Sequence, residues 1–118
     1  MSDNRVQEIL GKLKAIRGVH GAAVIERFGL VKGSALPGWI DEESVAAMVT
    51  LILKASQRAS KELEQGTFDG AIIESQKGRI LFDDIKENII VVISDNSAKL
   101  GIVNLKLKAA VKELEKLL

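Results

Sequence analysis

The sequence predicts an α+β fold: a five-stranded, mostly antiparallel sheet with one helix on one face and two on the other. Three stretches repeat apolar residues at helical spacing, and five shorter runs between them are rich in branched residues. One run, residues 89–93, is apolar at every position, which predicts a central strand covered on both faces. With 118 residues the chain can bury one core, so we expect a single domain spanning residues 1–118.

The first predicted elements are a helix and a hairpin. Residues 3–17 carry one apolar stripe, and Gly18 can adopt the left-handed conformation that ends a helix. Two short strands follow at residues 22–25 and 30–35, joined by a glycine-containing turn at residues 27–29. The second strand is polar and packs weakly, which predicts that it lies at an edge of the sheet.

A long helix over residues 42–65 is the best-marked element. Asp41 is the expected N-cap, acidic residues follow in the first turn, and Gly66 is expected to end the helix. At about 100° per residue, its polar residues form a stripe about 100° wide. The stripe consists of Thr50, Lys54, Gln57, Arg58 and Lys61.

Three strands and a helix complete the predicted order α-β-β-α-β-β-β-α. Residues 70–76 and 79–85 form a hairpin around a tight turn at Lys77 and Gly78. After a further turn comes the central strand at residues 89–94. The last helix is expected over residues 97–117, directly after three helix-capping residue types.

Gly101 is unusual because it lies only about a turn inside that last helix. A glycine inside a helix costs about 1 kcal/mol relative to alanine. We therefore expect the sheet or the first helix to pack so closely against Gly101 that a side chain would clash.

The middle helix has roughly twice the apolar arc that one sheet can cover. Small residues within this arc, such as Ala55 and Ala59, would let another backbone approach closely. Either the first or last helix of the same chain covers the excess, or the same helix of a second chain packs there. We favour a two-fold dimer, because the other two helices have faces of their own to bury.

Composition narrows the classes of partner and the compartment. The net charge is +1 and aromatic residues make up only 3%, which argues against nucleic-acid binding. The chain has no cysteine, no signal peptide at its start and no apolar run long enough to cross a membrane. We expect a soluble, cytoplasmic protein that does not insert into a membrane.

No catalytic or metal-binding pattern stands out, so we expect neither an enzyme nor a cofactor. His20 is the only histidine and is interpreted as a structural surface residue. Asp83 and Asp84 could hold a cation, but we favour two solvated carboxylates. Trp39 is either a cap on the core or an anchor for a partner, since tryptophan is a preferred interface residue.

Three stretches together resemble the roadblock/dynein light chain 7 family, and the likeness covers nearly the whole chain. They are IRGVHGAAVIERFGLVKGSA near the start, DEESVAAMVTLILKASQRASKELEQG in the middle, and AKLGIV at residues 98–103. The last is similar to the Asn-Leu-Gly-Leu-Val signature of that family, with Lys99 where asparagine often stands.

The resemblance implies a homodimer, or a heterodimer with a roadblock paralogue, in which third strands pair edge to edge and middle helices pack side by side. The implied dimer interface comprises Val45, Met48, Val49, Ile52, Ala55, Ala59, Ile72 and Glu74. Family members regulate small Ras-like GTPases or act as scaffolds in larger complexes. We therefore expect a GTPase to dock on the polar stripe and Trp39, unless the stripe is simply a solvated helix face.

Two alternatives remain open from the sequence. Related five-stranded modules hold small molecules between sheet and helix, which would make the protein a sensor. The chain could also be a structural subunit of a larger complex without any GTPase.

Overall fold

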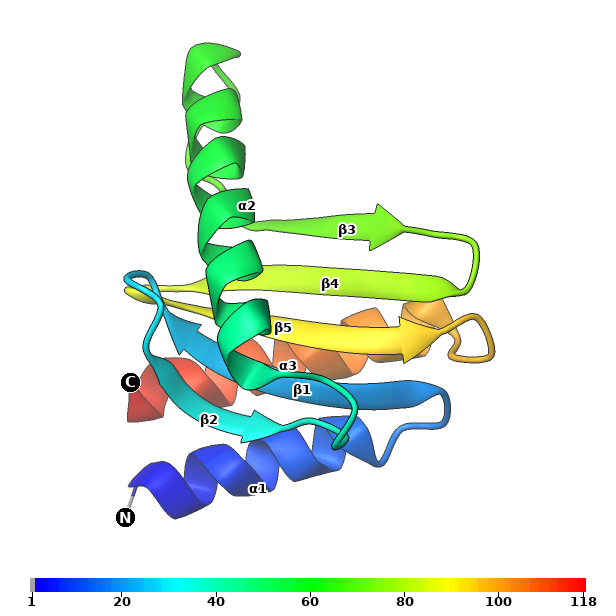
Figure 1. Cartoon of the computed structure of the whole chain (residues 1–118). Coiled ribbons are helices and arrows are strands. Elements are labelled where there is room, and N and C mark those ends of the chain that lie inside the picture. The colour runs from blue at the N-terminus through cyan, green and yellow to red at the C-terminus, as the bar shows by residue number, and fades with distance from the viewer. Residues whose placement is uncertain (1) are drawn as a thin grey trace.

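The computed structural model describes residues 2–118, with side chains from residue 4 onward, and its elements follow the predicted order (Figure 1). The elements are α1 (Ser2–Lys14), β1 (Val19–Glu26), β2 (Val31–Ala35), α2 (Glu42–Glu62), β3 (Gly70–Glu74), β4 (Gly78–Ile85), β5 (Asn88–Asp95) and α3 (Leu100–Leu117).

The five strands form one sheet in the order β2-β1-β5-β4-β3, and every neighbouring pair is antiparallel. β5 is therefore the central strand, as predicted. Its residues 89–92 are buried, because helices cover both faces at this point. β2 is an edge strand, which also confirms the prediction.

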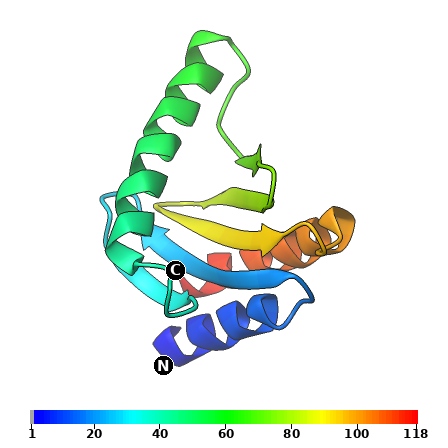
Figure 2. The same cartoon turned by 45° about the vertical axis from the view of Figure 1, so that its right-hand side comes forward.

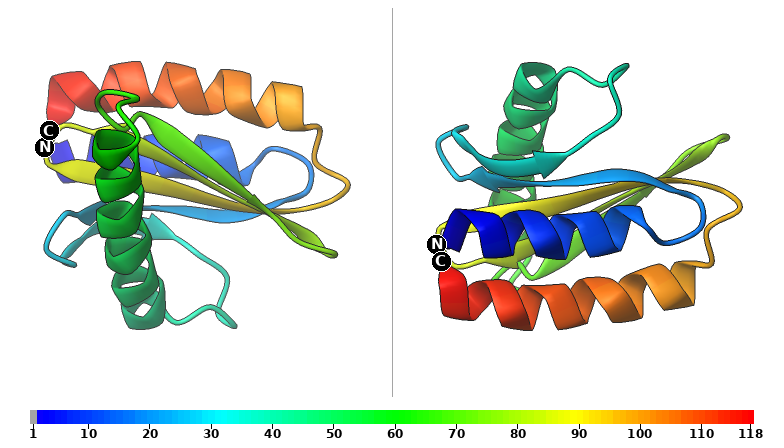
Figure 3. Two further views of the ribbon diagram at one scale, coloured as in Figure 1. Left: turned by 90° about the horizontal axis from the view of Figure 1, so that it is seen from above. Right: turned by 90° about the horizontal axis from the view of Figure 1, so that it is seen from below.

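The molecule has three layers, with α1 and α3 on one face of the sheet and α2 on the other (Figure 3). Side chains alternate between the faces along each strand and so build two separate cores. Leu81, Ile90 and Val92 pack with α1 and α3, whereas Phe82 and Val91 pack with α2. Within residues 2–118, no helix combines the length and apolar composition that crossing a membrane requires.

α1 ends at Lys14, three residues before the predicted boundary. Two backbone hydrogen bonds that span three residues each, from the Ile16 N–H to the Leu13 carbonyl and from the Val19 N–H to the Ile16 carbonyl, turn the chain out of the helix. Gly18 then adopts the predicted left-handed conformation, with φ of 87°.

α2 begins as predicted and ends earlier than predicted. The Asp41 carboxylate accepts hydrogen bonds from the backbone N–H of Ser44 (3.1 Å) and from its hydroxyl (2.7 Å). The helix ends at Glu62, because Glu64 takes the left-handed conformation (φ 58°) and the Gln65 N–H returns to the carbonyl of Ser60 (2.8 Å).

The β3–β4 turn lies one residue earlier than predicted, at residues 76–77. The N–H of Ser75 donates to the carbonyl of Gly78 (2.9 Å), which places Gly78 in β4 rather than in the turn. Glycine is needed there for close packing, since a Cβ would lie 2.0 Å from the Ser94 carbonyl oxygen.

α3 begins at Leu100, so the predicted start at residue 97 is wrong. Asp95 and Ser97 form a local turn instead, in which the Asp95 carboxylate accepts the Ser97 N–H (2.8 Å). The expectation for Gly101 is also wrong. Gly101 is exposed, and a Cβ built on it would meet nothing within 4 Å. Among the described residues, no contact explains this glycine.

Candidate functional site

The second half of α2 has no covering layer. The buried residues of this helix are Val45, Ala46, Val49 and Leu53, and none of residues 54–62 is buried. Figures 1 and 2 show this part of the helix rising beyond β3 and β4, before the chain returns to β3. At about 1.5 Å per residue, a stretch of roughly 13 Å extends past the sheet.

One side of α2 forms an apolar flank of Met48, Ile52, Ala55 and Ala59. Met48, Ala55 and Ala59 are exposed, and Ile52 is half-buried. The flank lies beside the line of residues that packs on the sheet, so it continues the apolar surface of the sheet outward. A second helix with small side chains could pack closely along it.

The structure corrects the predicted dimer interface at two positions. Val45 and Val49 are 6% and 3% exposed, because both side chains pack against the chain's own sheet. They support α2 from beneath and are not available to a second chain. Of the predicted interface residues on α2, the four of the apolar flank remain accessible.

The two edges of the sheet differ. α1 contacts the edge strand β2: the Gln7 amide donates to the Ser34 carbonyl, and Val6 packs next to Gly33. β3 pairs with β4 alone in the described part of the chain, and its sequence GAIIE contains neither lysine nor proline to discourage pairing. The outer edge of β3 is therefore ready to pair with another strand.

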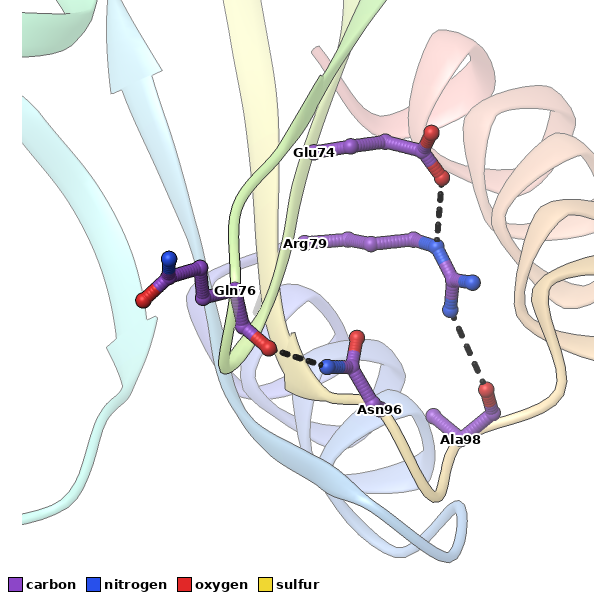
Figure 4. Close-up of polar contacts among 5 residues, drawn as sticks. All are labelled: Glu74, Gln76, Arg79, Asn96 and Ala98. Atoms are coloured by element: carbon purple, nitrogen blue, oxygen red, sulfur yellow. Dashed lines mark hydrogen bonds and ion pairs between the residues drawn. The ribbon is translucent and has the colours of Figure 1, made fainter.

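A small polar network fixes the hairpin that carries this edge (Figure 4). Arg79 donates from Nε to the Glu74 carboxylate (2.9 Å) and from a terminal nitrogen to the Ala98 carbonyl (3.4 Å). Asn96 donates to the Gln76 carbonyl (2.7 Å). Glu74, a predicted interface residue, thus has an ion-pair partner in its own chain, whereas Ile72 is 45% exposed at the middle of β3.

The predicted polar stripe lies on α2 on the side opposite the apolar flank. Lys54, Arg58 and Lys61 are exposed, and Arg58 forms an ion pair with Glu62 (2.8 Å). Thr50 is half-buried, and its hydroxyl donates to the Ala46 carbonyl (2.7 Å). The structure therefore brings the five residues of the polar stripe onto one helix face, as predicted.

Gln57 and Lys61 line a surface hollow of about 580 Å³ that also contains Arg27 and Asp84. Burial raises the pKa of the Asp84 carboxyl above its ordinary value, while the positive charge of Arg27 acts in the opposite direction. Arg27 Nε and Asp84 Oδ1 are both buried without a hydrogen-bond partner among the described residues. Because both atoms are inaccessible from the surface, they do not by themselves offer a contact to a partner.

Trp39 stands apart from the polar stripe, in the loop before α2. Its ring is 70% exposed and meets the His20 ring edge-on, with centroids 5.4 Å apart. A core cap would be buried, so that interpretation of Trp39 is wrong. His20 is a half-buried surface residue, as predicted.

Sequence reasoning missed an exposed apolar patch near the start of α2. Phe28 is 82% exposed, and Leu30 and Leu51 are also largely exposed; Phe28 and Leu51 line one hollow of about 510 Å³ with Thr50. The signal was present, because Phe28 and Leu30 lie in a hairpin turn, where an apolar side chain has no core to join.

The Asp83–Asp84 pair does not form a cation site. The two carboxylates lie on opposite faces of the sheet, because successive residues of a strand alternate. Asp83 is buried and bonds to Lys108 (2.8 Å), and Asp84 is half-buried with one inaccessible oxygen, so the expectation of two solvated carboxylates is wrong for both. Among the side chains that the structure describes, from residue 4 onward, three or more metal-ligating groups nowhere form a cluster.

Comparison with known proteins agrees with the fold described above. The Roadblock/LC7 domain model matches residues 5–95. The uncharacterized protein MJ1340 of Methanocaldococcus jannaschii is 33% identical over 110 residues, which covers 93% of this chain and 96% of that protein.

Among solved structures, Myxococcus xanthus MglB superposes with a TM-score of 0.91 at 23% identity, covering 97% of this chain and 87% of that one. The gliding protein MglB from Thermus thermophilus superposes with a TM-score of 0.88 at 23% identity, covering 98% and 90%. These identities establish the shared fold. On the strength of the domain match, which spans most of its length, the chain belongs to the Roadblock/LC7 family.

Proposed function

We propose that this chain forms a dimer that binds a small Ras-like GTPase, as a regulator or a scaffold. The observation that carries the proposal is the uncovered half of α2, residues 54–62. A short helix without tertiary support is unstable in water. A second chain that packs along the apolar flank would supply that support.

In the proposed dimer, β3 pairs with β3 of the partner and the two α2 helices pack side by side. Next to α2, the bare part of the sheet is apolar, with Ile73, Ile80 and Ile93 only half-buried. The partner's α2 would cover these residues as well. A single two-fold arrangement therefore accounts for the free edge, the apolar flank and the bare sheet together.

Binding rather than catalysis is the proposed mode of action. Two polar stripes on a dimer would form a broad platform, and the exposed Phe28 and Leu51 at its margin would supply apolar anchors. Membership in the Roadblock/LC7 family supports a Ras-like GTPase as the partner. A cytoplasmic location belongs to the same proposal, because that is where such a partner finds its nucleotide.

The test uses a small Ras-like GTPase from the same genome, loaded either with GDP or with a non-hydrolysable GTP analogue. We expect binding to one nucleotide state over the other, measured by biolayer interferometry, and a lowered affinity for a Lys54→Glu, Lys61→Glu variant. Lys77→Glu, in the exposed β3–β4 turn, is the matched control and should bind normally. Absence of binding in both states, with an unchanged hydrolysis rate, would contradict the proposal.

A further inference from the structure

The layer formed by α1 and α3 contains a groove that the proposed dimer and the GTPase platform do not use. The two helices lie side by side on the face of the sheet away from α2 (Figure 3). A surface groove of about 620 Å³ runs between them. Its apolar lining comes from Ile9 and Leu13 of α1, from Ile16 just after α1, and from Ile102, Ala109 and Ala110 of α3.

The groove continues along the helices toward the two chain ends. A second hollow of about 300 Å³ shares Ile9, Lys12 and Glu113 with the first and extends it to Arg5 and Lys116. The α1 wall is about 20 Å long, from 13 residues at about 1.5 Å each. This length matches three to four turns of another helix.

Large apolar side chains remain exposed beside the groove. Ile102, in its wall, is 45% exposed, and Leu105, on the outer face of α3, is 71% exposed. The core uses other residues of α3, such as Val103 and Leu107. The open backbone at Gly101 adjoins Ile102 and offers no obstacle to close approach. The apolar surface of a binding partner could therefore pack against these exposed side chains.

Charge is distributed unevenly between this layer and the rest of the chain. Residues 1–17 and 99–118 contain nine basic and four acidic residues, a net charge of +5. The whole chain has a net charge of +1, so residues 18–98 have a net charge of −4. Lys12 and Lys106 line the apolar part of the groove, one from each wall, together with Glu113.

We propose that this groove binds an amphipathic helix of a partner protein, with an apolar stripe flanked by acidic side chains. The apolar stripe would enter between α1 and α3, as in other helix-in-groove complexes. The acidic flanks would pair with Lys12 and Lys106 at the two rims. Together with the α2 face, the protein would then hold two different partners on opposite sides of its sheet.

A second copy of this chain fits the groove poorly. Two α1/α3 layers packed face to face would bring like charges together. α2, whose second half is accessible in the single chain, carries Lys54, Arg58 and Lys61 rather than acidic flanks. The chemistry of the groove therefore selects a different protein. This proposal does not rest on GTPase binding and is tested independently of it.

The test uses a fluorescent synthetic helix of about 18 residues, with leucine at every third or fourth position and glutamate on both flanks. We expect saturable binding by anisotropy, and a loss of affinity of at least about ten-fold in Lys12→Glu, Lys106→Glu and in Ile102→Asp. Lys54→Glu, in the opposite layer, is the control and should bind as the natural chain does. The Lys12→Glu, Lys106→Glu variant should in turn prefer a peptide with lysine in place of glutamate.

Two further probes separate this mode from simpler ones. A scrambled peptide of the same composition, without the leucine stripe, should bind at least about ten-fold more weakly. Equal binding of the scrambled peptide would overturn the proposal in favour of charge attraction alone. Binding to phosphatidylglycerol vesicles through the same residues, without peptide binding, would overturn it in favour of a membrane surface. If neither the peptide with the leucine stripe nor the vesicles bind, the proposal is also overturned.

Discussion

Gly18 packs against the backbone that leads into α3. Its φ is 87°, and a Cβ on Gly18 would lie 2.4 Å from the backbone nitrogen of Ala98. Its carbonyl also accepts the N–H of Asp95 (2.8 Å), so this glycine joins the residue before β1 to the end of β5. Gly101 lies a few residues further along the chain, in open space.

These two glycines should respond oppositely to alanine. Gly18→Ala should lower the free energy of unfolding by roughly 2 kcal/mol or more, because it adds backbone strain and a clash with Ala98. Gly101→Ala should raise it by up to about 1 kcal/mol, because alanine favours the helix and nothing lies in its way. Urea denaturation measures both. A destabilised Gly101→Ala dimer would reveal a close contact at Gly101 that the single chain does not contain.

Asp84 should make stability depend on pH. Burial raises the pKa of its carboxyl above the unfolded value, against the pull of Arg27. The folded state therefore favours the protonated form, and this contribution is present at low pH and lost as pH rises through the folded pKa. Asp84→Asn should raise the free energy of unfolding at pH 7, with a gain that shrinks as pH falls through the folded pKa and is gone below about pH 4, the unfolded pKa. A gain independent of pH would contradict the ionisation argument.

Lys108 protects a buried carboxylate. Asp83 is 6% exposed, and the Lys108 ammonium lies 2.8 Å from it. Lys108→Met should cost roughly 1–3 kcal/mol, because it leaves Asp83 buried without a counter-charge. Adding Asp83→Asn should restore part of that loss. If the double variant loses as much stability as the two single variants added together, the pair is not coupled.

At the scale of elements, α2 is the helix that the chain leaves incomplete. Val45, Val49 and Leu53 pack its first half against the sheet, and its second half extends beyond the sheet. β3 is also only partly paired among the described residues, since one of its edges pairs with β4 and the other edge is free. Both elements lie in the part of the molecule where we propose the second chain.

Glutamate at Ala55 and Ala59 should weaken self-association. The two side chains lie on the apolar flank, so their charges would be forced into the proposed helix pair. We expect the dimer dissociation constant to rise at least about ten-fold, or about 1.4 kcal/mol, in sedimentation equilibrium. Ala47→Glu, on another exposed side of the same helix, should leave it unchanged. Equal effects of both changes would point to helix propensity rather than to the interface.

At the scale of the whole molecule, a stable dimer links unfolding to concentration. The midpoint of thermal unfolding should rise with protein concentration, because dissociation accompanies unfolding. The Ala55→Glu, Ala59→Glu variant should lose this dependence. A midpoint that stays constant for the natural chain, together with a single-chain species at micromolar concentration, would contradict the dimer.

Much of the fold follows from periodicity alone. The run at residues 89–93 predicted the central strand, and Asp41 predicted the start of α2, because burial and capping act on the local chain. The boundaries were less accurate. The middle helix was expected to end at Gly66 but ends at Glu62, where Glu64 already takes a left-handed conformation and the Gln65 N–H returns to the Ser60 carbonyl.

The candidate site was predicted in part. The polar stripe on α2 follows from helical spacing, which fixes which residues share a face. Spacing does not say which way the helix is turned on the sheet, so Val45 and Val49 were assigned to a partner although they face the chain's own core. The exposure of Phe28 and Trp39 likewise depends on where their loops lie.

The sequence by itself determined the order of elements, the central strand and the surplus of apolar surface on the middle helix, because these depend on the spacing of side chains along one chain. Only the tertiary structure decided that Gly101 faces open space, that the carboxylates of Asp83 and Asp84 separate, and that α1 and α3 leave a groove between them. Those features depend on distances between elements far apart in the chain, which local patterns do not encode.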